Sequence, residues 1–325
     1  METAVPVDRT LTPPSVSVCM IAYNQENYVA QAIEGVLAQQ GAIPTDLIIG
    51  EDCSTDATRA VCESYARRHP DRIRLLPSAA NLGVMANFFR TLGHATGKYV
   101  AFCEGDDYWC DPDKLLKQVA WLESHPECGL VYSQVRWYFD SEQRFDRDWG
   151  GPESGETTLE RLLEGNCIPT PSVVIRRDLL ERYIEEVRPQ ERNWMMGDYP
   201  MWLYAAAHAE IRFINEPLAV YRILDESASH FRSFEKADRF CRSTLDIRRY
   251  FAGRYAPHLL PRLEENSLWE RFGFAVHYRN AQAAFSLCDA VRRAGGRFDT
   301  QERRALRRRT RRMIWRHPIL WLTRK

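Results

Sequence analysis

The chain has 325 residues, enough to bury a sizeable core, and its 44 basic and 44 acidic side chains cancel to a formal net charge of zero. Nine scattered cysteines with no C-x-x-C pair argue against a disulfide framework and favour a reducing compartment. No run of apolar residues reaches the length of a membrane span.

The charge is unevenly placed along the chain. From Arg292 to the C-terminus there are thirteen basic and two acidic residues, a net charge of +11, so the rest of the chain carries −11. This asymmetry predicts an acidic body that handles a cation and a substrate, and a basic tail that contacts an anionic surface. Because residues 1–15 contain Pro13-Pro14 and lack the apolar stretch of a signal peptide, we expect a cytoplasmic protein whose tail binds the membrane peripherally.

Short apolar runs alternate with helical patterns, which is typical of β-α-β units and a mostly parallel α/β sheet flanked by helices. Polar, glycine-rich residues 140–155 are the expected boundary between two halves, residues 15–139 and residues 140–230, and we expect residues 231–325 to form a helical C-terminal region with the basic tail. We expect strands at residues 16–22, 46–50, 72–76, 99–103 and 129–139, and helices at 28–39, 56–68, 112–125 and 199–208.

Three carboxylates follow the fourth predicted strand within four residues: Glu104, Asp106 and Asp107, called the carboxylate cluster below. Like charges this close repel, so the cluster is most stable beside a divalent cation or a cationic partner. The alternative is a solvated turn that caps the next helix. Asp111-Pro112 already has the N-cap and N1 pattern for that helix, which leaves the cluster free to bind Mn²⁺ or Mg²⁺.

Polar residues also follow the first two strands, and they face the same crevice at the carboxyl edge of the sheet. The ring of Tyr23 has the shape to stack on a base, and Asp52 has the acceptor for a base N–H or a ribose hydroxyl. The alternative for Ser54-Thr55-Asp56 is a helix cap. Since the sequence has no G-x-G-x-x-G or P-loop motif, we expect a metal at the cluster to neutralise the phosphates.

Taken together, residues 16–26, 49–56, 81–83 and 97–109 resemble the family-two glycosyltransferases of the GT-A fold, and the resemblance extends over residues 15–229. It implies transfer of a hexose or N-acetylhexosamine from a nucleotide-sugar donor with inversion at the anomeric carbon. Residues 15–139 would then be the donor-binding half, and residues 140–230 the acceptor and catalytic half. Glu104 and Asp106 stand at the D-x-D motif, with glutamate as its first member, so either Glu104 or Asp107 is the second direct metal ligand. The nucleotide-sugar site that the resemblance implies comprises Ala22, Tyr23, Asn24, Glu26, Asp52, Asn81 and Asp106.

The resemblance also implies a catalytic aspartate at Asp198, which removes the proton from the acceptor hydroxyl in a single displacement. The alternative is an N-cap of the helix at 199–208, worth about 1 kcal/mol. Val220-Tyr221-Arg222 matches a motif that a histidine usually follows two positions later, where this chain has Leu224. His230 is then a candidate metal or diphosphate ligand, or an exposed loop residue.

The tail combines eight arginines between residues 303 and 316 with Trp315 and Trp321. This pattern favours an interfacial segment on an anionic membrane leaflet over a nucleic-acid patch or a solvated helix. The sequence predicts a glycosyltransferase that moves a sugar from a UDP-sugar to a hydroxyl of a surface glycan or lipid-linked acceptor, with no nucleic acid involved. The alternatives are a non-catalytic binding protein on the same fold and a metal-dependent nucleotidyltransferase.

Overall fold

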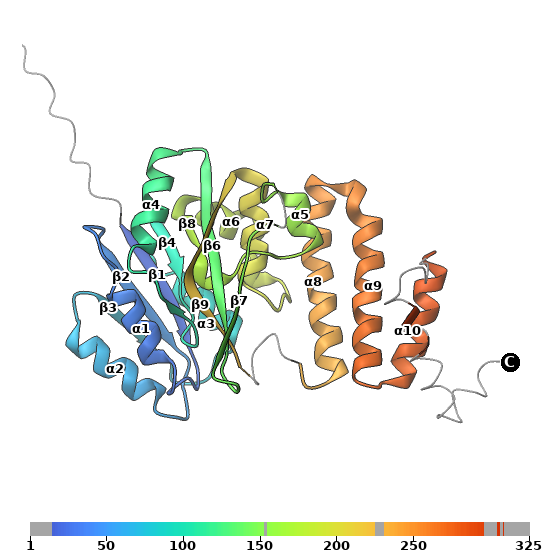
Figure 1. Cartoon of the computed structure of the whole chain (residues 1–325), viewed down its shortest axis with the longest axis horizontal. Helices are drawn as coiled ribbons and strands as arrows, with labels where there is room; N and C mark the ends of the chain where they lie inside the picture. Colours follow the sequence, from blue (N-terminus) through green and yellow to red (C-terminus); the bar gives the residue numbers. More distant parts are fainter. Residues whose placement is uncertain (1–14, 153–154, 225–230, 296–303, 306–307, 309–325) are drawn as a thin grey trace, which may run out of the picture.

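The computed structural model describes residues 15–152, 155–224 and 231–295, together with 304, 305 and 308. A nine-stranded mixed sheet forms the centre, with helices on both faces and three C-terminal helices side by side at one end (Figure 1). The strands are β1 (Val16–Ala22), β2 (Thr45–Glu51), β3 (Ile73–Pro77), β4 (Tyr99–Phe102), β5 (Tyr108–Trp109), β6 (Cys128–Phe139), β7 (Arg144–Trp149), β8 (Val174–Arg176) and β9 (Glu210–Ile223).

The strand order is β3-β2-β1-β4-β8-β6-β9-β5, with β7 paired to β6. The pairs β3–β2, β2–β1 and β1–β4 are parallel, so their carboxyl ends meet at one edge of the sheet. Strands β1 and β4 are apolar on both sides, because helices cover both faces of this half. Beyond β4 the sheet is mixed: β8 runs antiparallel to β4 and β6, whereas β6 and β9 are parallel.

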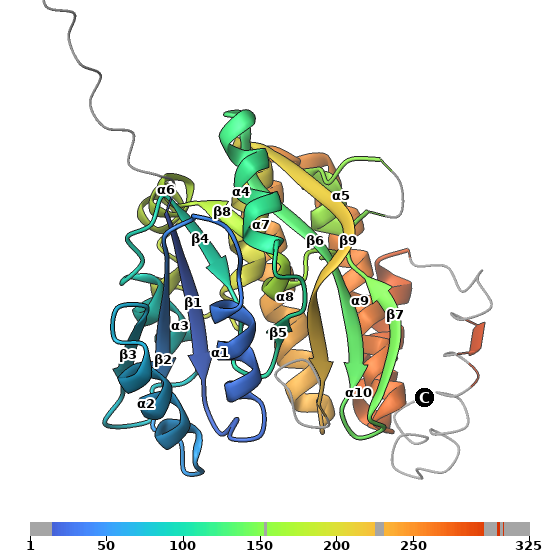
Figure 2. The ribbon, with the colours of Figure 1, turned by 60° about the vertical axis from the view of Figure 1, so that its left-hand side comes forward.

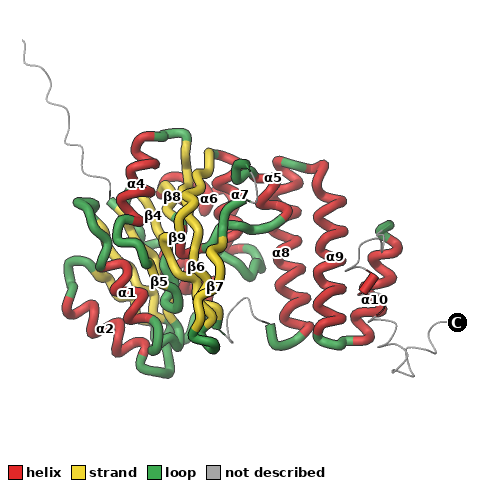
Figure 3. Tube along the Cα trace, in the orientation of Figure 1, coloured by secondary structure: helices red, strands yellow, loops and turns green. Residues whose placement is uncertain are grey.

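Helices cover both faces of the sheet (Figure 3), and the buried residues form one core on each face. One core lies between the sheet and α1, α2 and α4, and the other between the sheet and α3, α5, α6, α7 and α8. The helices are α1 (Val29–Leu37), α2 (Thr58–Arg68), α3 (Val84–Leu92), α4 (Lys114–Ser124), α5 (Leu159–Glu164), α6 (Arg177–Val187), α7 (Asp198–His208), α8 (Phe234–Tyr255), α9 (Leu260–His277) and α10 (Ala281–Arg293).

The C-terminal helices are joined to the body through α8. Its residues Leu245, Ile247 and Phe251 are buried in the same core as α6 and α7. Helices α9 and α10 share a separate small core around Phe272 and Val291. None of the helices in the described part of the chain is long and apolar enough to cross a membrane.

The first four predicted strands and the expected helices after β1 and β2 are confirmed to within two or three residues at each end. The helix predicted from residue 112 begins at Lys114, although the Asp111 carboxylate accepts the Asp113 N–H (2.7 Å) as a cap does. The polar stretch at 140–155 contains strand β7, which forms a hairpin with β6 (Figure 2). Strands β5 and β9 were also missing from the sequence expectation.

Candidate active site

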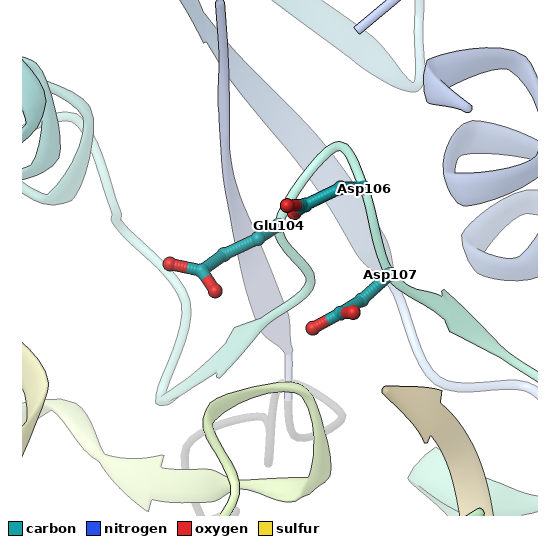
Figure 4. A group of neighbouring side chains, drawn as sticks. All are labelled: Glu104, Asp106 and Asp107. Carbon is teal, nitrogen blue, oxygen red and sulfur yellow. The ribbon is translucent and has the colours of Figure 1, made fainter. Parts of the chain in front are cut away.

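The carboxylate cluster lies in a tight turn between β4 and β5. The Gly105 N–H donates to the Ile21 carbonyl (3.1 Å) and the Asp107 N–H to the Glu104 carbonyl (3.0 Å), which fixes the turn against β1. A Cβ atom on Gly105 would lie 2.4 Å from the side-chain oxygen of Gln25 and displace it. One oxygen of each of the three carboxylates lies within 4.8 Å of the others, and the side chains reach to the same side of the loop (Figure 4).

Arg222, at the end of β9, holds this turn from behind. The backbone N–H of Arg222 donates to Oδ1 of Asp107 (2.8 Å), and Nη1 of its guanidinium donates to the carbonyl of Asp106 (2.5 Å). Its Nη2 donates to Gln31 on α1, and its guanidinium lies over the ring of Tyr108, 4.8 Å from the centroid. Arg222 therefore fixes two consecutive residues of the cluster while its own charge is buried between aromatic rings.

The carboxylates of the cluster resist ionisation in the absence of a cation. Burial, together with the charges of Asp106 and Asp198, raises the pKa of Glu104 to about 8. Burial, with Asp106 and Glu104 nearby, also raises the pKa of Asp107 well above its usual range. Burial raises the pKa of Asp106, although Arg222 and Gln25 oppose that shift. The site thus has more negative charge than its own groups neutralise.

The cluster fits a divalent cation. Asp107 is buried, and its Oδ2 has no hydrogen-bond partner among the described residues. An orphaned carboxylate oxygen costs free energy unless a cation or a proton satisfies it. Three converging carboxylates are the oxygen ligands that Mg²⁺ and Mn²⁺ prefer.

The structure brings Asp198 near the cluster from a distant part of the sequence. The indole N–H of Trp109, two residues after Asp107, donates to the Pro171 carbonyl (2.9 Å), and the adjacent Thr170 contacts Asp198. Asp198 is the first residue of α7, and Gly197 occupies the N-cap position. The Asp198 carboxylate accepts the Thr170 hydroxyl at Oδ2 (2.7 Å) and the Tyr199 N–H at Oδ1 (2.7 Å). These two hydrogen bonds fix the orientation of the Asp198 carboxylate, and the bond from the Tyr199 N–H also stabilises the start of α7. The catalytic role of Asp198 stays a prediction.

The loops after β1 and β2 are joined by side chains that the sequence had placed in the nucleotide site. Oδ1 of Asn24 accepts the Thr55 N–H (2.9 Å), and Oε2 of Glu26 accepts the Ala57 N–H (2.8 Å). Asn24 has a left-handed backbone (φ 52°), which asparagine tolerates better than most residues. These two side chains therefore hold the loop after β1 against the loop after β2.

Asp52 is buried and binds the loop that contains Asn81. Its two oxygens accept the N–H groups of Leu82 (2.8 Å) and Gly83 (2.9 Å), and its carbonyl accepts from the Asn81 amide (3.4 Å). Tyr23, the residue directly after β1, is 44% exposed. Ala22 is buried, and its carbonyl accepts the Asp52 N–H (3.0 Å). His230 lies outside the described residues.

Comparison with known proteins identifies the family. Residues 17–184 match the family model described as glycosyl transferase family 2. The chain belongs to glycosyl transferase family 2. This family-2 chain is 42% identical over 223 residues to EpsE of Bacillus subtilis, whose name assigns it to the glycosyltransferases, covering 68% of this chain and 77% of EpsE. The chain spans 58% of the length of uncharacterised mycobacterial relatives with which it is 37% identical over 206 residues.

Solved structures show that the family-2 chain has the predicted GT-A fold. TarS of S. aureus in complex with UDP-GlcNAc superposes with a TM-score of 0.55 at 17% identity, covering 86% of this chain and 90% of that one. The mannosyltransferase PcManGT of Pyrobaculum calidifontis, in complex with GDP-Man and Mn²⁺, superposes with a TM-score of 0.55 at 18% identity. That alignment covers 94% of this chain and 86% of PcManGT.

Two residues of this site were not given their roles from the sequence. Arg222 belongs to the Val220-Tyr221-Arg222 motif, but the motif alone does not indicate that the arginine braces the carboxylate turn. Thr170 lies in the segment expected on the acceptor side, and the structure shows it bonded to Asp198. An arginine beside aromatic residues and a threonine between two prolines are patterns too common to predict either contact.

Proposed function

We propose that this family-2 protein transfers a sugar from a UDP-sugar to a hydroxyl group of a surface glycan or a lipid-linked acceptor, with inversion. The proximity of the carboxylate cluster to Asp198 carries the proposal, because a cation held by the cluster would lie near a carboxylate that Thr170 and the Tyr199 N–H orient. Support also comes from two proteins of similar fold, one in complex with UDP-GlcNAc and one with GDP-Man and Mn²⁺.

Glu104, Asp106 and Asp107 would hold Mn²⁺ or Mg²⁺. When bound, the ion supplies a Lewis acid that neutralises charge on the diphosphate leaving group. Arg222 keeps Asp106 and Asp107 in place for this task. The exposed ring of Tyr23 would stack on the base of the nucleotide. Asp52 binds the backbone of the loop that contains Asn81 and so holds that loop in place.

Asp198 would act as the general base. As the acceptor oxygen bonds to the anomeric carbon, the bond from that carbon to the diphosphate oxygen breaks and the hydroxyl proton moves to the Asp198 carboxylate. The two hydrogen bonds to Asp198 hold its carboxylate in one orientation. A single displacement of this kind inverts the configuration at the carbon.

Replacing Asp198 with asparagine tests the assignment of the base. The amide is nearly isosteric but accepts no proton, so we expect turnover to fall about 10²- to 10⁴-fold while Mn²⁺-dependent UDP-sugar binding is retained. Activity is measured with a panel of UDP-sugars and acceptor glycans, and binding by calorimetry.

Asp178→Asn is the matched control. Asp178 stands in the first turn of α6 and accepts the next N–H (2.9 Å), as Asp198 does in α7, but β8 brings it to the opposite edge of the sheet. We expect Asp178→Asn to leave turnover unchanged. Near-normal turnover in Asp198→Asn would show that Asp198 only orders the start of α7.

A further inference from the structure

A cavity of about 490 Å³ lies between α1, β5, the end of β9 and the β6–β7 hairpin. Its volume is within the range of about 300–1,000 Å³ that is usual for small-molecule sites. Helix α1 and strand β5, which contribute to its lining, lie side by side (Figure 2). The lining residues are Asn27, Tyr28, Gln31, Tyr108, Tyr138, Asp140, Gln143, Phe145 and Arg222.

This cavity adjoins the proposed transfer site at Tyr108 and Arg222, but none of the residues proposed to bind the donor or the metal lines it. Helix α1 packs on one face of the sheet, whereas α7, which carries Asp198, packs on the opposite face. Arg222 lies between the two sites, since its guanidinium lines the cavity and its N–H and Nη1 hold the carboxylate turn. A ligand in this cavity would therefore contact the residue that braces the turn without occupying the donor crevice.

The lining combines aromatic rings with neutral hydrogen-bonding groups. Four of the nine lining residues are aromatic, and the rings of Tyr138 and Phe145 lie 4.9 Å apart, with Phe145 50% exposed. Asn27, Gln31 and Gln143 contribute amides, and the single cation Arg222 and single anion Asp140 cancel in charge. Such a surface matches neither a phosphate nor a cation, because each requires an excess of the opposite charge.

The polar groups of the cavity are already arranged by bonds among themselves. The Tyr28 hydroxyl donates to Oδ2 of Asp140 (2.8 Å), the Tyr138 hydroxyl donates to Oε1 of Gln143 (2.8 Å), and Nε2 of Gln143 donates to the Asp140 carbonyl (2.7 Å). Burial and the bond to Asp140 raise the pKa of Tyr28 to about 12, so its hydroxyl stays protonated. Hydroxyl, amide and carboxylate groups thus surround the rings as both donors and acceptors.

We propose that this cavity binds a neutral saccharide unit of a glycan, at a site distinct from the one where transfer takes place. A sugar ring presents an apolar C–H face, which packs on an aromatic ring, and hydroxyl groups at its edge, which need donors and acceptors together. Tyr138 and Phe145 would form the stacking surface, and Asp140, Gln143 and Asn27 would bind the hydroxyls. The proposal goes beyond the transfer reaction and does not depend on it.

Saturation-transfer-difference NMR on the full chain tests the proposal, with chitotetraose and mannotetraose as probes and neither metal nor donor added. We expect at least one probe to give a signal, strongest at ring C–H protons. Phe145→Ala and Tyr138→Ala, whose folding is checked by circular dichroism, should each weaken binding at least fivefold. Tyr255→Ala, which removes a similarly exposed ring from α8, is the matched control and keeps the signal.

A competition experiment separates this site from the donor crevice. Saturating UDP with Mn²⁺ should leave the saccharide signal in place, because no residue of the proposed donor or metal site lines the cavity. Three results would each overturn the proposal: no signal from either probe, a signal that Phe145→Ala and Tyr138→Ala leave unchanged, or a signal that UDP displaces. None of them bears on turnover, which the Asp198 variant tests independently.

Discussion

Arg222 shows how one side chain determines the geometry of a site that it does not enter. Its planar guanidinium reaches the Asp106 carbonyl and Gln31 at the same time, which a lysine ammonium does not do. We therefore expect Arg222→Lys to loosen the carboxylate turn and weaken Mn²⁺-dependent UDP binding by about tenfold to a hundredfold, the equivalent of one or two charge-assisted hydrogen bonds. Calorimetry measures the change.

The control for this prediction is Arg249→Lys. Arg249 on α8 likewise uses two nitrogens, both bonded to Glu264, but lies on the exposed side of the C-terminal helices. The Arg249→Lys variant should bind Mn²⁺ and UDP with the affinity of the unmodified protein. Unchanged affinity in Arg222→Lys would mean that the Asp107 contact, made by the backbone alone, is enough to hold the turn.

Asp52 combines a structural role with the nucleotide role predicted for it. Both of its oxygens accept backbone N–H groups, and the amide of asparagine offers only one acceptor, which leaves an N–H facing an NH₂ group. We expect Asp52→Asn to lower the free energy of unfolding by about 1–3 kcal/mol and also to weaken UDP binding. Urea denaturation and calorimetry measure the two effects, and a change in affinity with no loss of stability would contradict the structural role.

At the scale of elements, a buried carboxylate secures the loop between β2 and α2. Burial by itself would raise the pKa of Glu51, but the Ser54 N–H (2.6 Å) and the Arg59 guanidinium (2.5 Å) bind its oxygens and bring the pKa below its usual value. Its stabilising effect is therefore complete above pH of about 4.3 and is lost as the pH falls through the lower, folded-state pKa.

Glu51→Gln tests this link between pH and stability. We expect the variant to be less stable than the original protein by about 1–3 kcal/mol at pH 7, with the difference shrinking below pH of about 4. Urea denaturation at several pH values measures it. Glu63→Gln, which removes an exposed ion pair with Arg67 on α2, is the control and should change stability by less than about 0.5 kcal/mol.

The elements that sequence patterns predicted are those whose pattern is decided locally. Strands β1, β2 and β4 are buried apolar runs, so composition alone indicates them. Strand β5 has two residues, and β7 reads Arg-Phe-Asp-Arg-Asp-Trp with almost every side chain exposed. Such strands exist because β9 and β6 offer backbone partners, and no local pattern records that pairing.

The parts of the candidate site that local sequence indicates were predictable, and the contacts between distant segments were not. Carboxylates after a buried strand indicate a cation site, and the motif at Asp198 indicates its position in the chain. The buried Lys114 shows what patterns miss: helix periodicity places it at the start of α4, yet it lies 4.2 Å from the Trp109 ring centroid and donates to Gln118 (2.8 Å). The bracing by Arg222 likewise depends on a contact between β9 and the turn that only the fold creates.

At the scale of the whole molecule, the chain separates an acidic body from a basic tail. Helix α8 shares the core of the body, and the core of α9 and α10 ends at Val291, so the tail beyond residue 302 follows every buried residue that the structure describes. Of that tail, only residues 304, 305 and 308 are described. We propose that it docks on an anionic membrane surface, where each basic residue contributes about 1 kcal/mol.

Deleting residues 303–325 tests the docking. The deletion removes ten basic residues and no acidic one, which leaves a net charge of −10 that anionic vesicles repel. We expect the truncated protein to stay folded and to use a soluble acceptor, but to lose co-sedimentation with vesicles that contain phosphatidylserine. The full chain should lose it between 0.1 and 1 M salt, as the Debye length falls from about 10 Å to about 3 Å. Neutral phosphatidylcholine vesicles are the control. Equal sedimentation of both proteins would refute docking, and early melting of the truncated protein would mean that Trp315 and Trp321 pack on the body.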